Sequence, residues 1–190
     1  MVKIKDRNYS IQSSDAAIEV RSLRDSDLPF YAEWYKGRFT DDFTASLSEK
    51  EFERFLQRDL KENLLFIIFR NAIPCGEITV WNDTTLVFDN GIYAKPVYSI
   101  WFKFYGAGDD AFKTESLKLF IELAKTAKEK INTLYTLISK ENENDAPVYK
   151  QCGFAEIGPA FYRSKTEKFM EKNGLENVYK SSQMLIRQIG

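Results

Sequence analysis

The sequence predicts a single α/β domain, built as a mixed sheet with helices on both of its faces. Two observations predict this class. Apolar runs of strand length alternate with amphipathic stretches of helix length along the chain. A strand, a long helix and another strand also follow one another between residues 98 and 140, which is the order of a right-handed parallel crossover. The 190 residues contain no repeat and no linker long enough to divide them, so one domain is expected.

The first elements follow a polar, aperiodic extension over residues 1–17. Residues 18–23 alternate between apolar and polar side chains, which predicts a strand. Asp25 or Ser26 can cap the helix that comes next, and Gly37 favours its end.

A second helix is predicted over residues 48–63. Ser48 and Glu51 have the spacing of a capping box, in which each side chain accepts from the backbone N–H of the other residue. The apolar side chains of this helix recur at helical spacing and are expected to be buried: Phe52, Phe55, Leu56 and Leu60.

The middle of the chain predicts three strands. Residues 64–70 form a continuous apolar run, typical of a strand that is buried on both faces. A turn over 71–76 should connect it to a paired strand at 77–81. The long connection 82–96 has room for a short edge segment, and the aromatic run 98–104 predicts the third strand.

The strongest helical pattern covers residues 114–130, where an apolar stripe lies opposite a charged one. Residues 134–140 then predict a strand parallel to the one that precedes the helix. Two further strands are expected, at 154–158 and at 181–189.

The composition excludes several classes of function. The 27 basic and 28 acidic residues give a net charge of -1, without the basic excess of a protein that binds nucleic acid or an anionic membrane. The chain has no histidine, which excludes Ser-His-Asp and Cys-His nucleophile systems and most zinc sites. Acid–base chemistry must therefore use carboxylates, tyrosine, lysine, cysteine or water.

The chain is expected to be cytoplasmic. Cys75 and Cys152 are too few for a disulfide framework, and reduced thiols suit a reducing compartment. The N-terminus lacks the apolar centre of a signal peptide, and no apolar run reaches the roughly 18–20 residues that span a bilayer.

The segment 142–154, NENDAPVYKQCGF, combines turn residues with a short helical pattern. Asn144 or Asp145 can cap a helix of about two turns, in which Pro147 is tolerated because the first turn has no backbone acceptors to lose. Gly153 suits the left-handed conformation just beyond the last helical residue. These features are explained equally well by a helix that only packs on the sheet or by one that carries a functional side chain.

The same segment resembles the GCN5-related N-acetyltransferase (GNAT) family. This family has an Asn, a Tyr seven residues later and then Gly-Phe, matched here by Asn142, Tyr149, Gly153 and Phe154. The likeness in the order of elements covers residues 18–189. It implies one GNAT-like domain over 18–190, with a mostly antiparallel sheet and a central β-α-β crossover. It also implies that a strand such as 181–189 can pair with a second chain, so that the protein is a monomer or a homodimer.

The resemblance implies an N-acetyltransferase that uses acetyl-CoA as co-substrate and no metal. Tyr149 would be the acid that protonates the leaving thiolate, and Asn142 would bind the pantetheine arm. Glu77 is the first choice for the base, with Asp83 and Asp89 as alternatives.

Cofactor contacts are also expected from the end of the aromatic strand and from the turn that follows it. The family cradles the pyrophosphate with a Gln/Arg-x-x-Gly-x-Gly/Ala turn, whereas this chain has Gly108, Ala111 and Lys113 at those positions. Asp109 and Asp110 would repel a phosphate, which Lys113 and Thr114 could offset. An ordinary strand-to-helix turn with an Asp cap explains the same residues. The expected cofactor-binding residues are Phe102, Lys103, Phe104, Gly108, Asp110, Ala111, Phe112, Lys113, Thr114 and Asn142.

The acceptor is expected to be a primary amine of a small molecule or a peptide. Trp34, Tyr35, Asp41 and Asp42 combine aromatic rings with acids, a combination that suits a cationic amine. The resemblance leaves an aminoglycoside-like amine, a polyamine-like amine and a protein N-terminus open. A GNAT-like domain that binds a small molecule or a protein without catalysis is the alternative, because the turn before the long helix departs from the family pattern.

Overall fold

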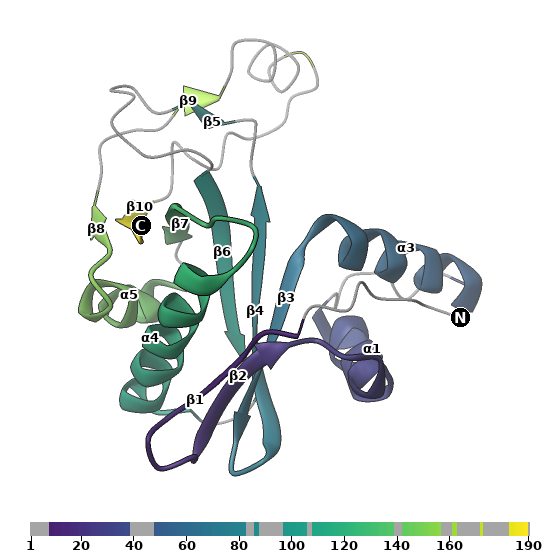
Figure 1. Cartoon of the computed structure of the whole chain (residues 1–190). Coiled ribbons are helices and arrows are strands. Elements are labelled where there is room, and N and C mark those ends of the chain that lie inside the picture. Colours follow the sequence, from purple (N-terminus) through teal and green to yellow (C-terminus); the bar gives the residue numbers. More distant parts are fainter. Residues whose placement is uncertain are drawn as a thin grey trace.

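The computed structural model shows one large mixed sheet flanked by helices (Figure 1). It describes residues 8–38, 48–82, 86–87, 97–105, 108–138, 142–156, 161–162, 172 and 183–189. The strands of the large sheet are, in spatial order, β1 (Ser10–Gln12), β2 (Ile18–Ser22), β3 (Leu64–Arg70), β4 (Ile73–Asn82), β6 (Val97–Phe104), β7 (Thr133–Ile138), β10 (Gln183–Gln188) and β8 (Ala155–Glu156). A separate small sheet pairs β5 (Leu86–Val87) with β9 (Phe161–Tyr162).

The described helices comprise α1, α3, α4 and α5 and two 3-10 turns. Their bounds are η1 (Asp25–Asp27), α1 (Leu28–Arg38), α3 (Glu49–Glu62), α4 (Asp110–Thr126), η2 (Glu143–Asp145) and α5 (Ala146–Gln151). Adjacent strands of the large sheet are antiparallel except β6 and β7, which are parallel and are joined through α4. The predicted fold class and its central crossover are therefore confirmed.

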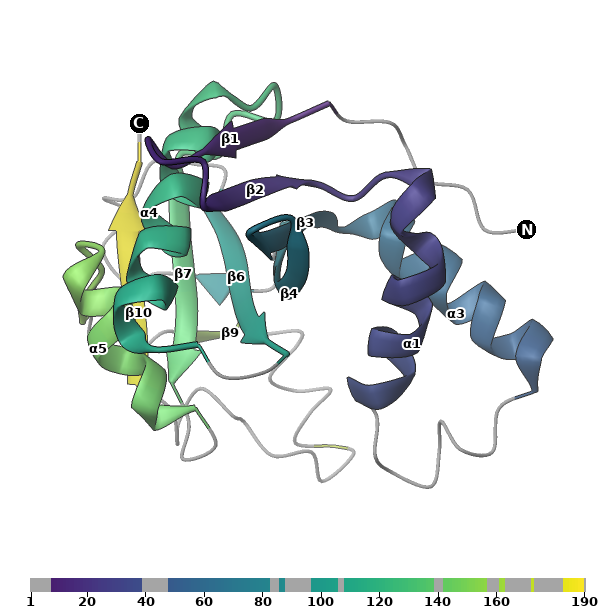
Figure 2. The same cartoon turned by 90° about the horizontal axis from the view of Figure 1, so that it is seen from below.

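Two apolar cores lie on opposite faces of the sheet. Figure 2 shows α4 and α5 on one side of the central strands and α1 and α3 on the other. One core joins side chains of α4 and α5 to the sheet, with Phe66 and Phe120 in edge-to-face contact at 5.1 Å. The other core joins α1 and α3 to β3, and includes Tyr31, Leu56 and Ile67. β3 contributes side chains to both cores, because its apolar run is buried on both faces as predicted.

The capping box of α3 is also confirmed. The Ser48 side chain accepts from the Glu51 backbone, and the Glu51 carboxylate accepts from the Ser48 N–H at 2.9 Å. Of the stripe predicted to be buried, Phe52, Leu56 and Leu60 lie in the core with α1, while nothing is described of the Phe55 side chain.

The start of α1 differs from the prediction. Neither Asp25 nor Ser26 is its cap, because both belong to the 3-10 turn η1. The Asp27 carboxylate accepts from the Arg24 N–H at 2.8 Å and from the Arg21 guanidinium at 2.6 and 2.9 Å. This buried ion pair holds the beginning of α1 against β2. The helix then continues through Gly37 to Arg38.

The hairpin between β3 and β4 is tighter than predicted. Its turn contains only Asn71 and Ala72, both left-handed with φ of 50° and 65°. β4 therefore begins at Ile73, well before the predicted residue 77. Pro74 is accommodated because the ladder shifts register there, leaving Cys75 as the extra residue of a bulge.

α4 begins and ends four residues earlier than predicted. Asp109 is its N-cap, and the Asp109 side chain accepts from the Phe112 N–H at 2.8 Å. At the other end, Ala127 adopts an extended conformation with ψ of 139°, which ends the helix. The helix boundary was predicted too late, but the alternative of an ordinary turn with an Asp cap agrees with the position of Asp109.

Two terminal segments have roles that the sequence did not indicate. Within the extension 1–17, β1 pairs with β2, and the Tyr9 hydroxyl donates to Glu129 Oε2 at 2.9 Å and accepts from the Lys128 N–H at 3.0 Å. β10 lies between β7 and β8. It is therefore not the edge strand that the sequence suggested, although β8 pairs only with Leu185 and Ile186, and pairing with a second chain stays a prediction.

Candidate active site

The parallel strands β6 and β7 pair over only part of their length. The pairs are Val97 with Thr133, Tyr98 with Leu134 and Ser99 with Tyr135. β6 continues to Phe104 while paired with β4 on its other side, and Figure 2 shows it running away from β7. From Ile100 onward, the edge of β6 that faces β7 therefore has backbone groups that β7 does not bind. We call this opening the β6–β7 split.

Tyr149 of α5 reaches the point where the two strands separate. Its ring contacts Phe102 of β6 edge-to-face at 6.3 Å and Phe154 at 5.2 Å. Its hydroxyl is hydrogen-bonded to Thr136, the β7 residue that follows the last pair with β6. The side chain is only 2% exposed, and burial raises the pKa of Tyr149 above its ordinary value of 10. The phenol therefore stays protonated at neutral pH.

The backbone after Tyr149 holds α5 in place. Phe154 N–H donates to the Tyr149 carbonyl at 3.1 Å and Gly153 N–H to the Lys150 carbonyl at 2.9 Å. Gly153 has φ of 77°, the left-handed conformation expected from the sequence. Arg187 of β10 donates to the Cys152 carbonyl. The short helix is thus attached both to the turn that follows it and to β10. These bonds orient Tyr149.

Asn142 lies just after β7, at the same end of the sheet. Its side-chain amide donates to the Leu137 carbonyl at 3.0 Å. The predicted caps Asn144 and Asp145 make no side-chain cap bond to α5. The reason in the case of Asp145 is that its carboxylate is paired with Lys113 at 2.9 Å.

Side chains at the start of α4 already contact other residues of the protein. Phe112 is buried and contacts Phe104 at 5.4 Å, while the Arg70 guanidinium lies 4.7 Å from the centre of the Phe112 ring. Thr114 is buried and donates to Gln151 Oε1 of α5 at 3.3 Å. Of the residues expected near a phosphate, Phe112, Lys113 and Thr114 therefore make side-chain contacts within the protein. Gly108, Asp110 and Ala111 lie at the same helix start, where an added Cβ at Gly108 would meet only ordinary contacts.

The residues of β6 point alternately to the two faces of the sheet. Phe102 and Phe104 face α4, and they contact each other at 4.7 Å. Lys103 points to the opposite face, and its ammonium lies 5.5 Å from the centre of the Trp101 ring and 5.4 Å from that of Tyr105. Of the three β6 residues expected to contact a cofactor, Phe102 and Phe104 thus lie on the side of α4, and Lys103 lies on the opposite side.

Glu77 of β4 lies on the same side as Lys103. It is paired in register with Lys103 on one side and with Ile67 on the other, and it is 0% exposed. Since Ile67 belongs to the core with α1 and α3, the Glu77 carboxylate faces those helices. Glu77 is in the middle of its strand and does not open it, because β4 begins at Ile73.

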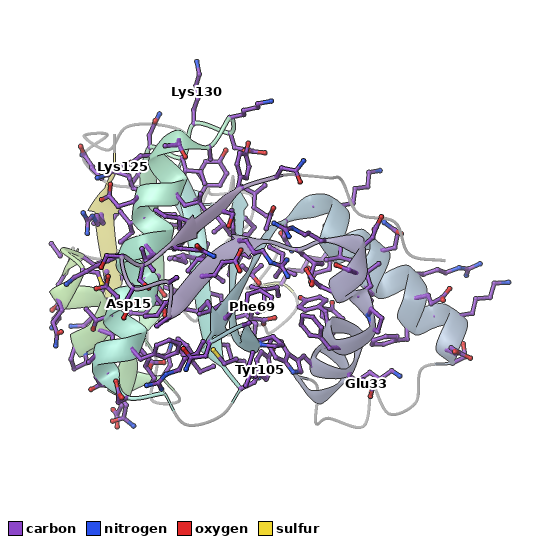
Figure 3. The ribbon with its side chains drawn as sticks, turned by 60° about the horizontal axis from the view of Figure 1, so that its bottom comes forward. Asp15, Glu33, Phe69, Tyr105, Lys125 and Lys130 are labelled. Carbon is purple, nitrogen blue, oxygen red and sulfur yellow. The ribbon has the colours of Figure 1, made fainter. Side chains whose placement is uncertain are left out.

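Trp34 of α1 completes this surface. Its ring stacks on Tyr105 at 4.1 Å, and Figure 3 shows Tyr105 between the sheet and α1. Tyr35 is only 2% exposed and belongs to the core instead. Asp41, Asp42, Asp83 and Asp89 lie outside the described residues. We call this surface the α1 face, and it is formed by Trp34, Glu77, Thr79, Trp101, Lys103 and Tyr105.

Sequence reasoning missed Trp101, Tyr105 and Thr136. Alternation along residues 98–104 could have separated Trp101 and Lys103 from Phe102 and Phe104, because neighbouring residues of a strand point to opposite faces. Thr136 carried no such signal. It becomes relevant only because α5 folds back over β7 and places a phenol beside it.

The stability of the protein should fall between pH 9 and pH 11. Burial raises the pKa of Cys152 from 9.0 to about 11 in the folded state. Within this window the unfolded thiol loses its proton while the folded one keeps it, so rising pH favours unfolding. Urea midpoints measured at pH 8, 9, 10 and 11 should fall more steeply in the wild type than in Cys152→Ala. Equal slopes would show that the buried thiol does not couple to folding.

The parallel pair β6–β7, the crossover through α4 and the short helix α5 define the fold of the GCN5-related N-acetyltransferases. Solved structures of that fold match nearly the whole chain. An acetyltransferase of the GNAT family from Streptococcus pneumoniae is 16% identical with a TM-score of 0.55, covering 91% of this chain and 99% of its own. The aminoglycoside acetyltransferase AAC(6')-Ib with coenzyme A and kanamycin is 13% identical with a TM-score of 0.59, covering 90% and 94%.

An uncharacterized protein from Bacillus halodurans (bh2621) is also similar, with a TM-score of 0.63, 12% identity and coverage of 95% and 90%. By sequence, the chain matches no family model and no curated protein. The resemblance to the GNAT family is therefore confirmed in the fold. Across the described part of the chain, every helix is too short or too polar to cross a membrane.

Proposed function

We propose that the protein is an acetyl-CoA-dependent N-acetyltransferase that acetylates a primary amine by direct attack in a ternary complex. One observation carries this proposal: the buried hydroxyl of Tyr149 lies at Thr136, where β6 separates from β7. This phenol is protonated at neutral pH and lies beside the opening between the two strands. It is in position to protonate a leaving group that enters the split.

The β6–β7 split fits the thioester arm of acetyl-CoA. The arm contains two amides, and the free edge of β6 offers backbone N–H and C=O groups to such a chain, as a sheet edge does to an added strand. Phe102 and Phe104 provide apolar contact on the side of α4. Asn142, which follows β7, adds an amide at the far side of the split.

Within this site, the reaction requires two proton transfers. The amine nitrogen attacks the thioester carbon and forms the C–N bond, and the C–S bond then breaks. The leaving sulfur takes the Tyr149 proton, since a phenol can donate to a thiolate as it forms. The amine must lose its own proton. Glu77 is our candidate for the base because its carboxylate belongs to the α1 face.

The ADP end of acetyl-CoA has a poorer fit. The Phe112 N–H at the start of α4 is already bound by Asp109, and Lys113 is paired with Asp145. A phosphate there would have to compete with a carboxylate for the helix N-terminus. A non-catalytic domain with weakened affinity for CoA is favoured by this observation and is our second candidate.

Asp109→Asn should tighten the binding of CoA about threefold. The amide keeps an oxygen that can cap Phe112 and removes the negative charge beside the phosphates. Calorimetric titration of CoA into both proteins checks this, and Glu122→Gln, at an exposed acid of α4 far from the helix start, is the control. Weaker binding in Asp109→Asn would show that the capping carboxylate assists the site.

The proposed function is tested by titrating the protein with acetyl-CoA and then incubating the complex with primary amines. The amines are an aminoglycoside, a polyamine and a peptide with a free N-terminus, and the product is identified by its added acetyl mass. Binding of a ligand at 100 times its dissociation constant should add about 2.7 kcal/mol of stability. CoA binding without any acetylation would favour the non-catalytic domain, and absence of binding at millimolar concentration would reject both roles for CoA.

A further inference from the structure

The α1 face already contains a cation among its aromatic rings. The Lys103 ammonium lies 5.5 Å from the centre of the Trp101 ring and 5.4 Å from that of Tyr105, which in turn stacks on Trp34. Within the described residues, no carboxylate lies at salt-bridge distance from it. Glu77 is the register partner of Lys103 on β4, but the two side chains form no ion pair, so the aromatic rings are the groups that the Lys103 ammonium contacts in the described part of the chain.

This arrangement argues against a polycationic acceptor at these rings. An ammonium over an aromatic face occupies the position that a cationic ligand would take. A second cation would also be repelled by the first, because two like charges a few ångströms apart interact strongly near a low-dielectric surface. The aromatic residues expected to attract a cationic amine are thus better suited, together with Lys103, to an anionic group.

Thr79 adds a second polar group on the same face. It is 4% exposed, it is paired in register with Trp101, and no group described in the structure hydrogen-bonds its hydroxyl. A buried hydroxyl without a partner costs free energy that a bound ligand oxygen would recover. An ammonium and a hydroxyl provide two donors, and a carboxylate provides two acceptor oxygens.

We infer that the acceptor is an amine that also carries a carboxylate, bound through Lys103 with Thr79 as a second donor. This inference rests on the proposed function, because it assumes that the acceptor reaches the β6–β7 split from the α1 face. Lys103 lies on the part of β6 that has left β7, so its side chain is beside the backbone that would hold the thioester. A carboxylate held there would place the amine of the same molecule near the reacting carbon.

The test uses pairs of amines that differ only in a carboxylate: tyrosine and tyramine, lysine and cadaverine, alanine and ethylamine. Initial rates with saturating acetyl-CoA give kcat and KM for each. We expect kcat/KM to favour the carboxylate-bearing member of at least one pair about tenfold, which corresponds to one charge-assisted hydrogen bond. If the decarboxylated amine is the equal or better substrate in every pair, the inference is wrong.

Variants of Lys103 then locate the preference. Lys103→Met keeps the apolar stem on the rings and should lower kcat/KM for the preferred amino acid through KM, so that the preference over the matching amine falls about tenfold. Lys103→Arg should restore most of the loss, and Lys61→Met on the exposed end of α3 is the control. A purely structural role for Lys103 would reduce both members of the pair alike and would overturn the inference.

Calorimetric binding of the amino acid in the presence of CoA separates this inference from the proposed function. Binding that is lost in Lys103→Met, in a protein that transfers no acetyl group, would reject the enzyme and keep the carboxylate site. Acetylation of amines with no dependence on Lys103 would keep the enzyme and reject the site. Thr79→Val should weaken the same binding about threefold, since it removes only a neutral donor.

Discussion

Tyr149→Phe is expected to lower the rate of acetyl transfer about a hundredfold, the usual order for loss of one general acid. Phenylalanine keeps the ring contacts with Phe102 and Phe154 and removes only the hydroxyl. Without that proton the sulfur must leave as a bare thiolate. Single-turnover rates with preformed complex should therefore fall, while the affinity for CoA, measured by calorimetry, stays within about twofold.

Two controls separate acid catalysis from packing. Thr136→Val removes the hydrogen bond to Tyr149 and keeps the phenol, so it should cost less than tenfold in rate. An acetyl thioester of a more acidic thiol needs less protonation, and its rate should be less sensitive to Tyr149→Phe than that of acetyl-CoA. The loss of about 1 kcal/mol in stability expected from the unpaired Thr136 should appear in Tyr149→Phe regardless of its activity.

An unchanged rate in Tyr149→Phe would show that Tyr149 is not the general acid. A fall in rate that is equal for both thioesters would point to misplacement of α5. In that case the fixed backbone around Gly153 and Phe154, and not the phenol, would be the contribution of this segment.

Asp27→Asn is expected to destabilise the folded protein by about 3 kcal/mol. The Asp27 carboxylate binds the Arg21 guanidinium at 2.6 and 2.9 Å in a buried position. Among the carboxylates that the structure describes, the amide leaves Arg21 with the more distant Glu19, at 3.7 Å. Urea unfolding of both proteins measures the difference, and Asp25→Asn, an exposed acid in the same turn, is the matched control and should change stability by less than about 0.5 kcal/mol.

The pH dependence of this difference has a definite sign. Burial alone would raise the pKa of Asp27, but the hydrogen bond from Arg21, the Arg24 N–H and the two arginine charges outweigh it and lower the pKa below 3.8. The contribution is therefore fully present above pH 3.8 and is lost as the pH falls through the lower folded value. Stability measured from pH 6 down to pH 2 should converge for wild type and Asp27→Asn. A constant gap would mean that the ion pair does not carry the effect.

Asp27→Asn also bears on the proposed acceptor site. The ion pair with Arg21 holds the start of α1 on β2, and α1 places Trp34 on Tyr105. Loosening that anchor should raise the KM for the amine more than it changes the affinity for CoA, whose proposed contacts with Phe102 and Phe104 are on the side of α4.

Most of the fold could be predicted because its signals are local. The apolar run 64–70 and the capping box of Ser48 and Glu51 depend only on neighbours in the sequence, and both were predicted correctly. The errors occurred at the boundaries of elements, where the geometry of a cap or a bulge decides which residue is the first of the element. α4 begins at Asp110 because Asp109 caps it, and β4 begins at Ile73 because a bulge accepts Pro74.

Part of the candidate site could be predicted in the same way. The spacing of Asn142, Tyr149 and Gly153 pointed to α5 and to a family. It could not show that Lys113 would pair with Asp145. Because of this ion pair, the Lys113 ammonium is already bound and does not offer its charge to a phosphate at the start of α4. Nor could the spacing show which face of the sheet Lys103 would join.

By itself, the sequence determined the class of the fold, the helix that carries Tyr149 and the absence of histidine chemistry. Periodicity, turn residues and composition suffice for these, because each is a property of a short segment or of the whole chain. Only the tertiary structure decided what Tyr149 touches, where β6 leaves β7 and that Trp34, Tyr105 and Lys103 meet on one surface. Those facts depend on the register of strands and on the packing of α1 and α5, which bring together residues far apart in the chain.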